Sequence, residues 1–165
     1  MRVEELAAPD KIVRGGQPHK MFRFVTAQNR DGAVVIVEKA GKIALARQNR
    51  FAINTVSLEL PQGMGDKEDK DPIETGMREA SEELGIKVKD GKNIGNLFAD
   101  TAVLANKIHI IVCKYDGYIN EGDGELLSVH YKSIKEVKKL LKENKIKDGI
   151  SMSALLTYLI YKEEI

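Results

Sequence analysis

Asp71-Pro-Ile-Glu-Thr-Gly-Met-Arg-Glu-Ala-Ser-Glu-Glu-Leu-Gly85 is the stretch that decides the fold of this 165-residue chain. An acidic residue followed by proline, with a glutamate in the first turn, is typical of a helix start. Apolar residues then recur four, three and four apart, at Ile73, Met77, Ala80 and Leu84. This spacing gives one buried stripe, and Gly85 is a common stop. The sequence therefore predicts a helix from Asp71 to Leu84.

Three acidic residues, Glu79, Glu82 and Glu83, fall on one face of this predicted helix, because positions three and four apart are neighbours there. One interpretation is an ordinary solvated face. The other is a site for a hard divalent cation, which takes oxygen ligands and keeps some water. Arg78, next to them, can orient a carboxylate through its planar guanidinium.

The segment before the helix, Leu60-Pro-Gln-Gly-Met-Gly65, predicts a strand end that runs into a glycine-containing loop. Such a loop lets the backbone approach a metal or a phosphate closely, although a plain turn has the same composition. Both interpretations stay open on the sequence alone.

Other segments predict a sheet with two further helices. Strands are expected at 22–28, 33–38, 43–47, 56–60, 97–103, 107–115 and 128–131, and helices at 133–144 and 151–161. Ala40-Gly41 predicts a hairpin turn. The order gives an α+β fold, layered α/β/α around a mixed sheet. At roughly 150 residues per domain we expect one domain over residues 1–165, with residues 1–20 as an N-terminal arm.

Composition excludes several classes of protein. There are 26 basic and 25 acidic residues, a net charge of +1 that argues against a dedicated nucleic-acid binder. The longest uninterrupted apolar run, Ala33–Val37, is far too short for a membrane helix. A single cysteine, Cys113, excludes an intrachain disulfide. We therefore expect a cytoplasmic protein without a membrane partner.

The glycine loop and the helix that follows resemble the signature of the Nudix hydrolase family. Its second half, Arg-Glu-apolar-x-Glu-Glu-x-Gly-apolar, is present as Arg78 through Ile86. The first half differs, because the register of the family's isolated glutamate falls on Lys70. One inserted residue would restore Gly63, and Glu68 or Asp69 would then replace the missing glutamate.

The resemblance extends to the branch that hydrolyses ADP-ribose and other nucleoside diphosphate sugars. It rests on Arg47-Gln-Asn-Arg50, on Leu58-Glu-Leu-Pro61 and on the final segment from Asp148. In this branch the resemblance implies that Arg47, Arg50 and Glu59 bind substrate. Thr101–Ala105 lacks the proline that ADP-ribose hydrolases tend to have there.

The resemblance also implies roles for the signature residues. Glu79 and Glu83 match the main metal ligands, Glu82 an auxiliary ligand, and the carbonyl of Gln62 or Gly63 would complete the site. Arg78 and Glu82 are placed among the catalytic residues. The water-activating residue is expected at Glu125, with Glu121 as the fallback.

The function implied is a Mg²⁺-dependent pyrophosphohydrolase, with Mn²⁺ as an alternative metal. Its substrate would be a nucleoside diphosphate joined to another group, ADP-ribose or a nucleotide sugar, and its products a nucleoside monophosphate and a sugar phosphate. Two alternatives stay open: a dinucleoside polyphosphate or RNA-cap hydrolase, and a non-catalytic nucleotide-binding sensor. The partners expected are the small-molecule substrate and a second copy of the chain in a homodimer.

Overall fold

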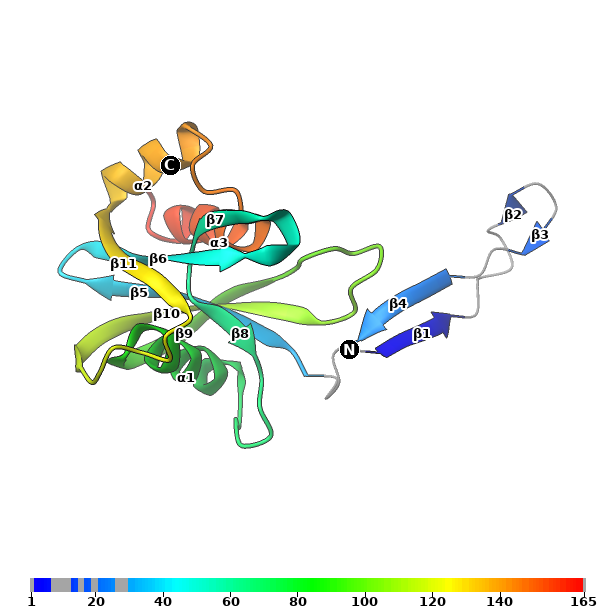
Figure 1. Ribbon diagram of the computed structural model, residues 1–165, viewed down its shortest axis with the longest axis horizontal. Helices are drawn as coiled ribbons and strands as arrows, with labels where there is room; N and C mark the ends of the chain where they lie inside the picture. Colours follow the sequence, from blue (N-terminus) through cyan, green and yellow to red (C-terminus); the bar gives the residue numbers. More distant parts are fainter. Residues whose placement is uncertain (1, 7–12, 15–16, 19–20, 26–29, 165) are drawn as a thin grey trace.

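The computed structural model describes residues 2–6, 13–14, 17–18, 21–25 and 30–164, and its centre is a mixed seven-stranded sheet (Figure 1). The strand order is β11-β6-β5-β10-β9, with β7 paired to β6 and β8 to β5. Only β10 and β5 run parallel within this sheet. These strands are β5 (Gly32–Lys39), β6 (Lys42–Arg50), β7 (Thr55–Glu59), β8 (Gln62–Met64), β9 (Ile86–Phe98), β10 (Lys107–Tyr118) and β11 (Leu126–Ser133).

Helices cover both faces of the sheet, which confirms the predicted α/β/α layering. Figure 1 shows α1 (Pro72–Leu84) on one side and α2 (Ile134–Lys142) with α3 (Gly149–Tyr161) on the other. Alternate residues of the central strands divide between two cores. Val35, Ala44 and Ala46 belong to the core under α1, whereas Val34, Ile36 and Leu45 belong to the core with Leu155 and Leu159 of α3.

The α1 helix begins and ends where the sequence predicts. The Asp71 carboxylate accepts hydrogen bonds from the backbone N–H of Ile73 at 2.8 Å and of Glu74 at 2.9 Å. Gly85 closes the helix in the left-handed conformation, with φ of 63°. Gly76 is explained by close packing, because a Cβ there would lie 2.8 Å from Cγ1 of Ile111 on β10. The helix therefore sits directly on the sheet.

Most strand predictions are confirmed, and one is wrong. The hairpin turn has Ala40 at φ 48° and Gly41 at φ 74°. The strand expected at 97–103 instead begins at Ile86, directly after the helix stop, and ends at Phe98. Residues 101–103 form a turn. The Ser133 capping box that starts α2 is present as predicted.

The N-terminal arm contains two short ribbons outside the central sheet (Figure 1). β1 (Arg2–Leu6) pairs with β4 (Met21–Val25), and β2 (Val13–Arg14) pairs with β3 (Gln17–Pro18). β4 matches part of the strand expected at 22–28, and the remainder, 26–28, lies outside the described residues. Within the part of the chain that the structure describes, no helix is both long and apolar enough to cross a membrane.

Candidate active site

Arg78 lies at the centre of the charged cluster on α1. Its guanidinium donates to both oxygens of Asp69 at 3.1 Å and to the carbonyl of Met64 at 2.9 Å. It also contacts Glu79 at 2.9 Å and Glu82 at 2.8 Å. One arginine thus fixes the loop before the helix to the two glutamates on it, which is the orienting role that the resemblance implies.

Of the two acidic residues between which the sequence left the choice open, Glu68 and Asp69, it is Asp69 that contacts Arg78. Its side chain is only 5% exposed, whereas neighbouring Glu68 is exposed. Hydrogen bonds from Arg78, from the backbone N–H of Asp66 and from the Thr75 hydroxyl lower the pKa of Asp69 to about 2. Lys70, in the register of the family's glutamate, turns instead to Glu74 at 3.3 Å.

Glu79 lies against the glycine loop. A Cβ on Gly63 would come within 2.1 Å of the Glu79 carboxyl carbon, so only glycine leaves room for this carboxylate. Burial raises the pKa of Glu79 and outweighs the opposing charge of Arg78. The sequence predicted a main-chain role for Gly63, and the structure adds that its missing side chain makes space for a predicted metal ligand.

Glu83 is the least compensated charge in the site. Burial, together with the negative charges of Glu79 and Asp123, raises its pKa to about 8, although a hydrogen bond from the Gln62 backbone acts in the opposite direction. Among the described residues, its Oε2 is the buried side-chain oxygen without a hydrogen-bond partner. A buried carboxylate oxygen without a partner is costly, and a bound cation removes that cost.

These donors fit a divalent metal of the type that keeps its own water. Across the described ranges, no three His, Cys, Asp or Glu side chains gather closely enough to hold a metal ion by themselves. Mg²⁺ and similar ions need only one or two carboxylates, with water and substrate phosphate as the other ligands. Glu79 and Glu83 would supply these carboxylates, and carbonyls at Gln62 or Gly63 would be the nearest main-chain donors.

A second polar network joins the site to the sheet and to α3. Glu59 is 2% exposed, and its carboxylate accepts from Nε of Arg50 at 3.1 Å and from Nε2 of Gln62 at 3.0 Å. Gln62 also reaches the Asp148 carboxylate, which caps α3, at 3.4 Å. The charges of Arg50 and Glu83 shift each other's pKa values. Arg50 and Glu83 therefore interact electrostatically across the site.

The three residues predicted to bind substrate, Arg47, Arg50 and Glu59, do not all lie on one face of the sheet. Register places Ala46 opposite Glu59 and Arg50 opposite Thr55, so Arg50 and Glu59 share the α1 face of the sheet. Arg47 pairs with Leu58 and points to the other face, where it is exposed. The structure thus brings Arg50 and Glu59 to the site and leaves Arg47 on the opposite side.

The acidic loop after β10 is fixed to the end of α1. Asn120 donates its backbone N–H to the Gly85 carbonyl at 3.1 Å, and Asp123 donates to the Glu82 carbonyl at 3.0 Å. Gly122 packs so closely that a Cβ there would lie 2.4 Å from the Glu83 carbonyl oxygen. Helix and loop are therefore interlocked.

Three acidic side chains on this loop have different surroundings. Glu121 accepts a hydrogen bond from the Tyr118 hydroxyl at 2.7 Å, and the Glu125 side chain is exposed. Asp123, which sequence reasoning missed, is the loop residue whose charge raises the pKa of Glu83. No local sequence signal distinguishes Asp123, because its proximity to Glu83 comes from the interlocked loop.

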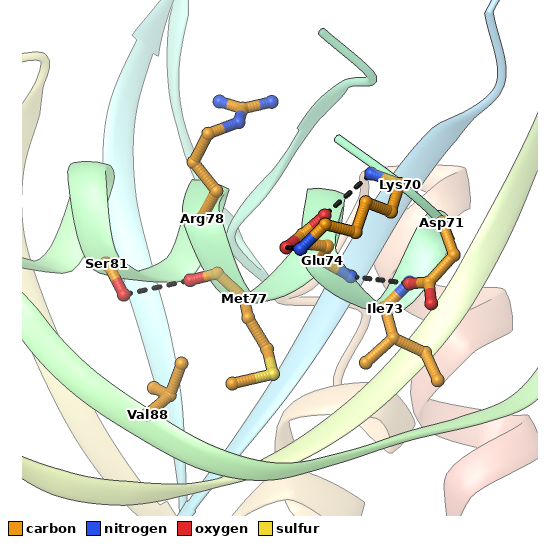
Figure 2. A pocket seen from close by; sticks show the side chains of 8 residues that line it. All are labelled: Lys70, Asp71, Ile73, Glu74, Met77, Arg78, Ser81 and Val88. Atoms are coloured by element: carbon orange, nitrogen blue, oxygen red, sulfur yellow. Dashed lines mark hydrogen bonds and ion pairs between the residues drawn. The ribbon is translucent and has the colours of Figure 1, made fainter. Parts of the chain in front are cut away.

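A cavity of about 560 Å³ lies beside α1 and is lined in part by Arg78 (Figure 2). Ile73, Met77 and Val88 form its apolar wall, and Lys70 and Glu74 join at its rim. Figure 2 shows the Arg78 side chain leaving the helix away from Met77 and Val88. Glu79, Glu82 and Glu83 do not line this cavity, so it does not define the site.

Comparisons with known proteins bear on the family and the fold. The NUDIX domain family model matches residues 28–153. A solved structure described as an ADP compounds hydrolase is 20% identical, with a TM-score of 0.78, over 100% of this chain and 95% of its own. A NUDIX hydrolase from Nitrosomonas europaea is 16% identical, with a TM-score of 0.62, over 81% and 90% respectively. Curated protein sequences give no match. Because the family model covers most of the chain and the fold agrees, the chain belongs to the NUDIX family.

Proposed function

We propose that this Nudix hydrolase is a metal-dependent pyrophosphohydrolase that cleaves a nucleoside diphosphate linked to another group, ADP-ribose or a nucleotide sugar. The observation that carries the proposal is the buried Glu83 carboxylate, which has an unpartnered oxygen and lies beside Glu79 and Arg50. The structural neighbour described as an ADP compounds hydrolase supports the same substrate class. The products would be a nucleoside monophosphate and a sugar phosphate.

Each residue of the candidate site has a separate role in this reaction. Glu79 and Glu83 would hold Mg²⁺ or Mn²⁺, Glu82 would assist, and the metal would neutralise the diphosphate and polarise its oxygens. Arg78 keeps Glu79 and Glu82 in place through its contacts at 2.9 and 2.8 Å. Arg50, held by Glu59, directs positive charge to the place where the diphosphate would lie. A loop carboxylate accepts a proton from the attacking water, which reacts in line with the leaving group.

Glu125 is our candidate for that proton acceptor. Its backbone N–H is anchored to the Asp123 carboxylate at 2.9 Å, while its side chain is exposed and can turn toward a bound substrate. We expect Glu125→Gln to lower kcat at least about tenfold with little change in KM, in the range typical of general-base removal. Steady-state kinetics on Glu125→Gln, Glu121→Gln and Asp123→Asn rank the three. A larger kcat loss in Glu121→Gln or Asp123→Asn would transfer the role to that residue.

A substrate panel tests the proposed reaction. ADP-ribose, several nucleotide sugars, dinucleoside polyphosphates and capped RNA are incubated with the protein and Mg²⁺ or Mn²⁺, and released monophosphates are measured. We expect the nucleoside diphosphate sugars to be hydrolysed fastest. Faster release from dinucleoside polyphosphates or capped RNA would favour that alternative, and binding without hydrolysis of any compound would identify a sensor.

The proposed homodimer rests on the N-terminal ribbon. One side of the ribbon is mostly apolar: Glu5 lies on it opposite Phe22, and its apolar side chains are those of Val3, Phe24 and Phe22. These side chains are 58%, 37% and 46% exposed. The other side carries Glu4, which pairs with Arg2 at 2.7 Å and with Arg23 at 2.9 Å. The backbone of Phe24 bonds to Val103 and Ala105, but a two-stranded ribbon is marginal in water without packing on its faces. We propose that a second copy covers this mostly apolar face.

Substitution on the apolar face tests this homodimer. Because a symmetric interface repeats each contact, Phe22→Ser should weaken dimerisation by about a hundredfold. Arg23→Ser, on the charged face of the same strand, is the matched control and should change it little. Sedimentation velocity over a concentration series gives the dimer dissociation constants of the wild type and of the two variants. A monomeric wild type, or equal effects of the two variants, would contradict the proposal.

A further inference from the structure

The tip of the β6–β7 hairpin holds an aromatic side chain in a rigid, exposed position. The two strands stay paired up to Arg50 opposite Thr55. A single turn of 3₁₀ helix, Phe51–Ile53, closes the hairpin, and the N–H of Asn54 donates to the Phe51 carbonyl at 3.2 Å. Phe51 is nonetheless 90% exposed. The backbone thus presents a phenyl ring to solvent without leaving it on a loose loop.

This tip borders a cavity that shares Arg50 with the candidate active site. The cavity has a volume of about 370 Å³ and is lined by Asn49, Arg50, Phe51, Asn54, Thr55 and Val56. Arg50 belongs to both places, because its guanidinium pairs with Glu59 while its charge acts on Glu83. A ligand whose phosphates lie beside Glu83 and Arg50 can therefore extend past Arg50 into the cavity.

The lining has the chemistry that suits a nucleobase. A phenyl ring offers a flat apolar face on which a heterocycle stacks, and this contact tolerates any base. An asparagine amide presents a donor and an acceptor side by side, which matches the N6 and N7 edge of adenine but not the two acceptors on guanine. Asn54 carries such an amide next to Phe51.

We propose that this cavity holds the purine base of the nucleotide, with Phe51 stacking on it and Asn54 favouring adenine. The inference rests on the proposed function, because it places the diphosphate between the α1 glutamates and Arg50. It assigns binding of the nucleoside half of the substrate to the hairpin tip, away from the metal ligands. Phe51 then contributes to affinity and specificity and not to the chemical step.

The affinity for AMP, a proposed product, tests the base site separately from catalysis. Isothermal titration calorimetry in EDTA compares AMP with ribose 5-phosphate, which keeps the phosphate and sugar but lacks the base. Phe51→Ala should weaken AMP binding by roughly ten- to a hundredfold, the range found when a stacking aromatic is removed, and leave ribose 5-phosphate binding unchanged. Ile53→Ala is the matched control, since Ile53 is 64% exposed on the same turn but does not line the cavity.

Kinetics and base preference complete the test. With ADP-ribose as substrate, Phe51→Ala should raise KM about tenfold at constant kcat. Asn54→Gly keeps the left-handed backbone, with φ of 46° in the wild type, and removes the amide. We expect the wild type to bind AMP more tightly than GMP and this variant to lose that preference.

Several results would overturn the inference. The first is that the wild-type protein does not bind AMP. The second is that Phe51→Ala loses AMP binding and ribose 5-phosphate binding equally. The third is that Phe51→Ala changes the oligomeric state and leaves the AMP affinity unchanged. The last result would assign the tip to a contact between copies of the chain. If the wild type hydrolyses none of the compounds in the panel but AMP binding still depends on Phe51, the proposed reaction fails while the base site stands.

Discussion

Glu83→Gln is expected to reduce hydrolysis by several orders of magnitude and, in the same protein, to raise the melting temperature. The activity loss follows because the variant loses a carboxylate that would hold the metal. The gain in stability follows because the wild-type carboxylate is buried with an unpartnered Oε2 beside Glu79. A neutral amide removes that like-charge repulsion, and we expect a gain of ~1–2 kcal/mol in the metal-free protein.

The stability difference should depend on pH in a defined direction. Folding raises the pKa of Glu83 from 4.5 to about 8. Below pH 4.5 the carboxyl group is protonated in both folded and unfolded chains and costs little. Between 4.5 and 8 the unfolded chain releases the proton more readily, so the wild type loses stability as pH rises. Thermal unfolding in EDTA at pH 5 and pH 8 should therefore show a larger advantage of Glu83→Gln at pH 8.

Glu82→Gln is the matched control for this pair of effects. The Glu82 side chain is 54% exposed and already paired with Arg78, so its removal should leave the melting temperature nearly unchanged at both pH values. Near-wild-type turnover of Glu83→Gln at saturating Mg²⁺ would show that the metal site is assigned wrongly. If Glu83→Gln melts at the same temperature as the wild type at pH 8, or below it, the buried Glu83 carboxylate does not destabilise the fold.

Asp69→Ala should be the most destabilising change in the loop before α1. It removes the carboxylate to which the partly buried Arg78 guanidinium donates two hydrogen bonds of 3.1 Å, and to which the Thr75 hydroxyl donates a third. Removing one partner of such a network costs ~2–3 kcal/mol. Activity should fall at least about tenfold as well, because Arg78 also positions Glu79 and Glu82. Urea unfolding and steady-state kinetics measure the two effects.

Glu68→Ala tests the alternative that the sequence left open. Glu68 is exposed, so its removal should change stability by less than ~0.5 kcal/mol and leave turnover unchanged. The pKa of Asp69 is lowered to about 2, so its contribution to stability is complete above pH 4 and is lost as pH falls toward 2. Wild type and Asp69→Ala should accordingly converge in stability at acid pH. Equal effects of the two substitutions would mean that neither residue replaces the family's glutamate.

The sequence predicted the elements whose boundaries are marked by local chemistry. Asp71 and Gly85 define α1, Ala40-Gly41 defines the hairpin, and the Ser133 capping box starts α2. β9 was misplaced because it is an edge strand, rich in lysine and glycine along 86–98, and lacks the dense apolar pattern of a buried strand. The single domain over residues 1–165 and the cytoplasmic location remain predictions.

The site was predictable where its residues share one helix. Glu79, Glu82, Glu83 and Arg78 follow from helical spacing, which fixes their relative positions. Arg47 and Arg50 are three residues apart on a strand, so the period of two already places them on opposite faces, which the family resemblance alone does not reveal. The places of Asp69 and Asp123 depend on how loops pack against α1, and a single sequence does not specify such packing.

The interlock between α1 and the loop after β10 divides that loop into a part packed tightly on the helix and a part with open space around it. Asn120 and Gly122 are wedged against Gly85 and the end of the helix, with no room even for a methyl group. Gly124, by contrast, has open space around it and a φ of 85°. The backbone of the next residue, Glu125, is tied on both sides, because its N–H donates to the Asp123 carboxylate at 2.9 Å and Leu126 pairs with Gln48 in the sheet. The proposed base therefore stands on a bridge between helix and sheet, and only its exposed side chain needs to turn to reach a bound substrate.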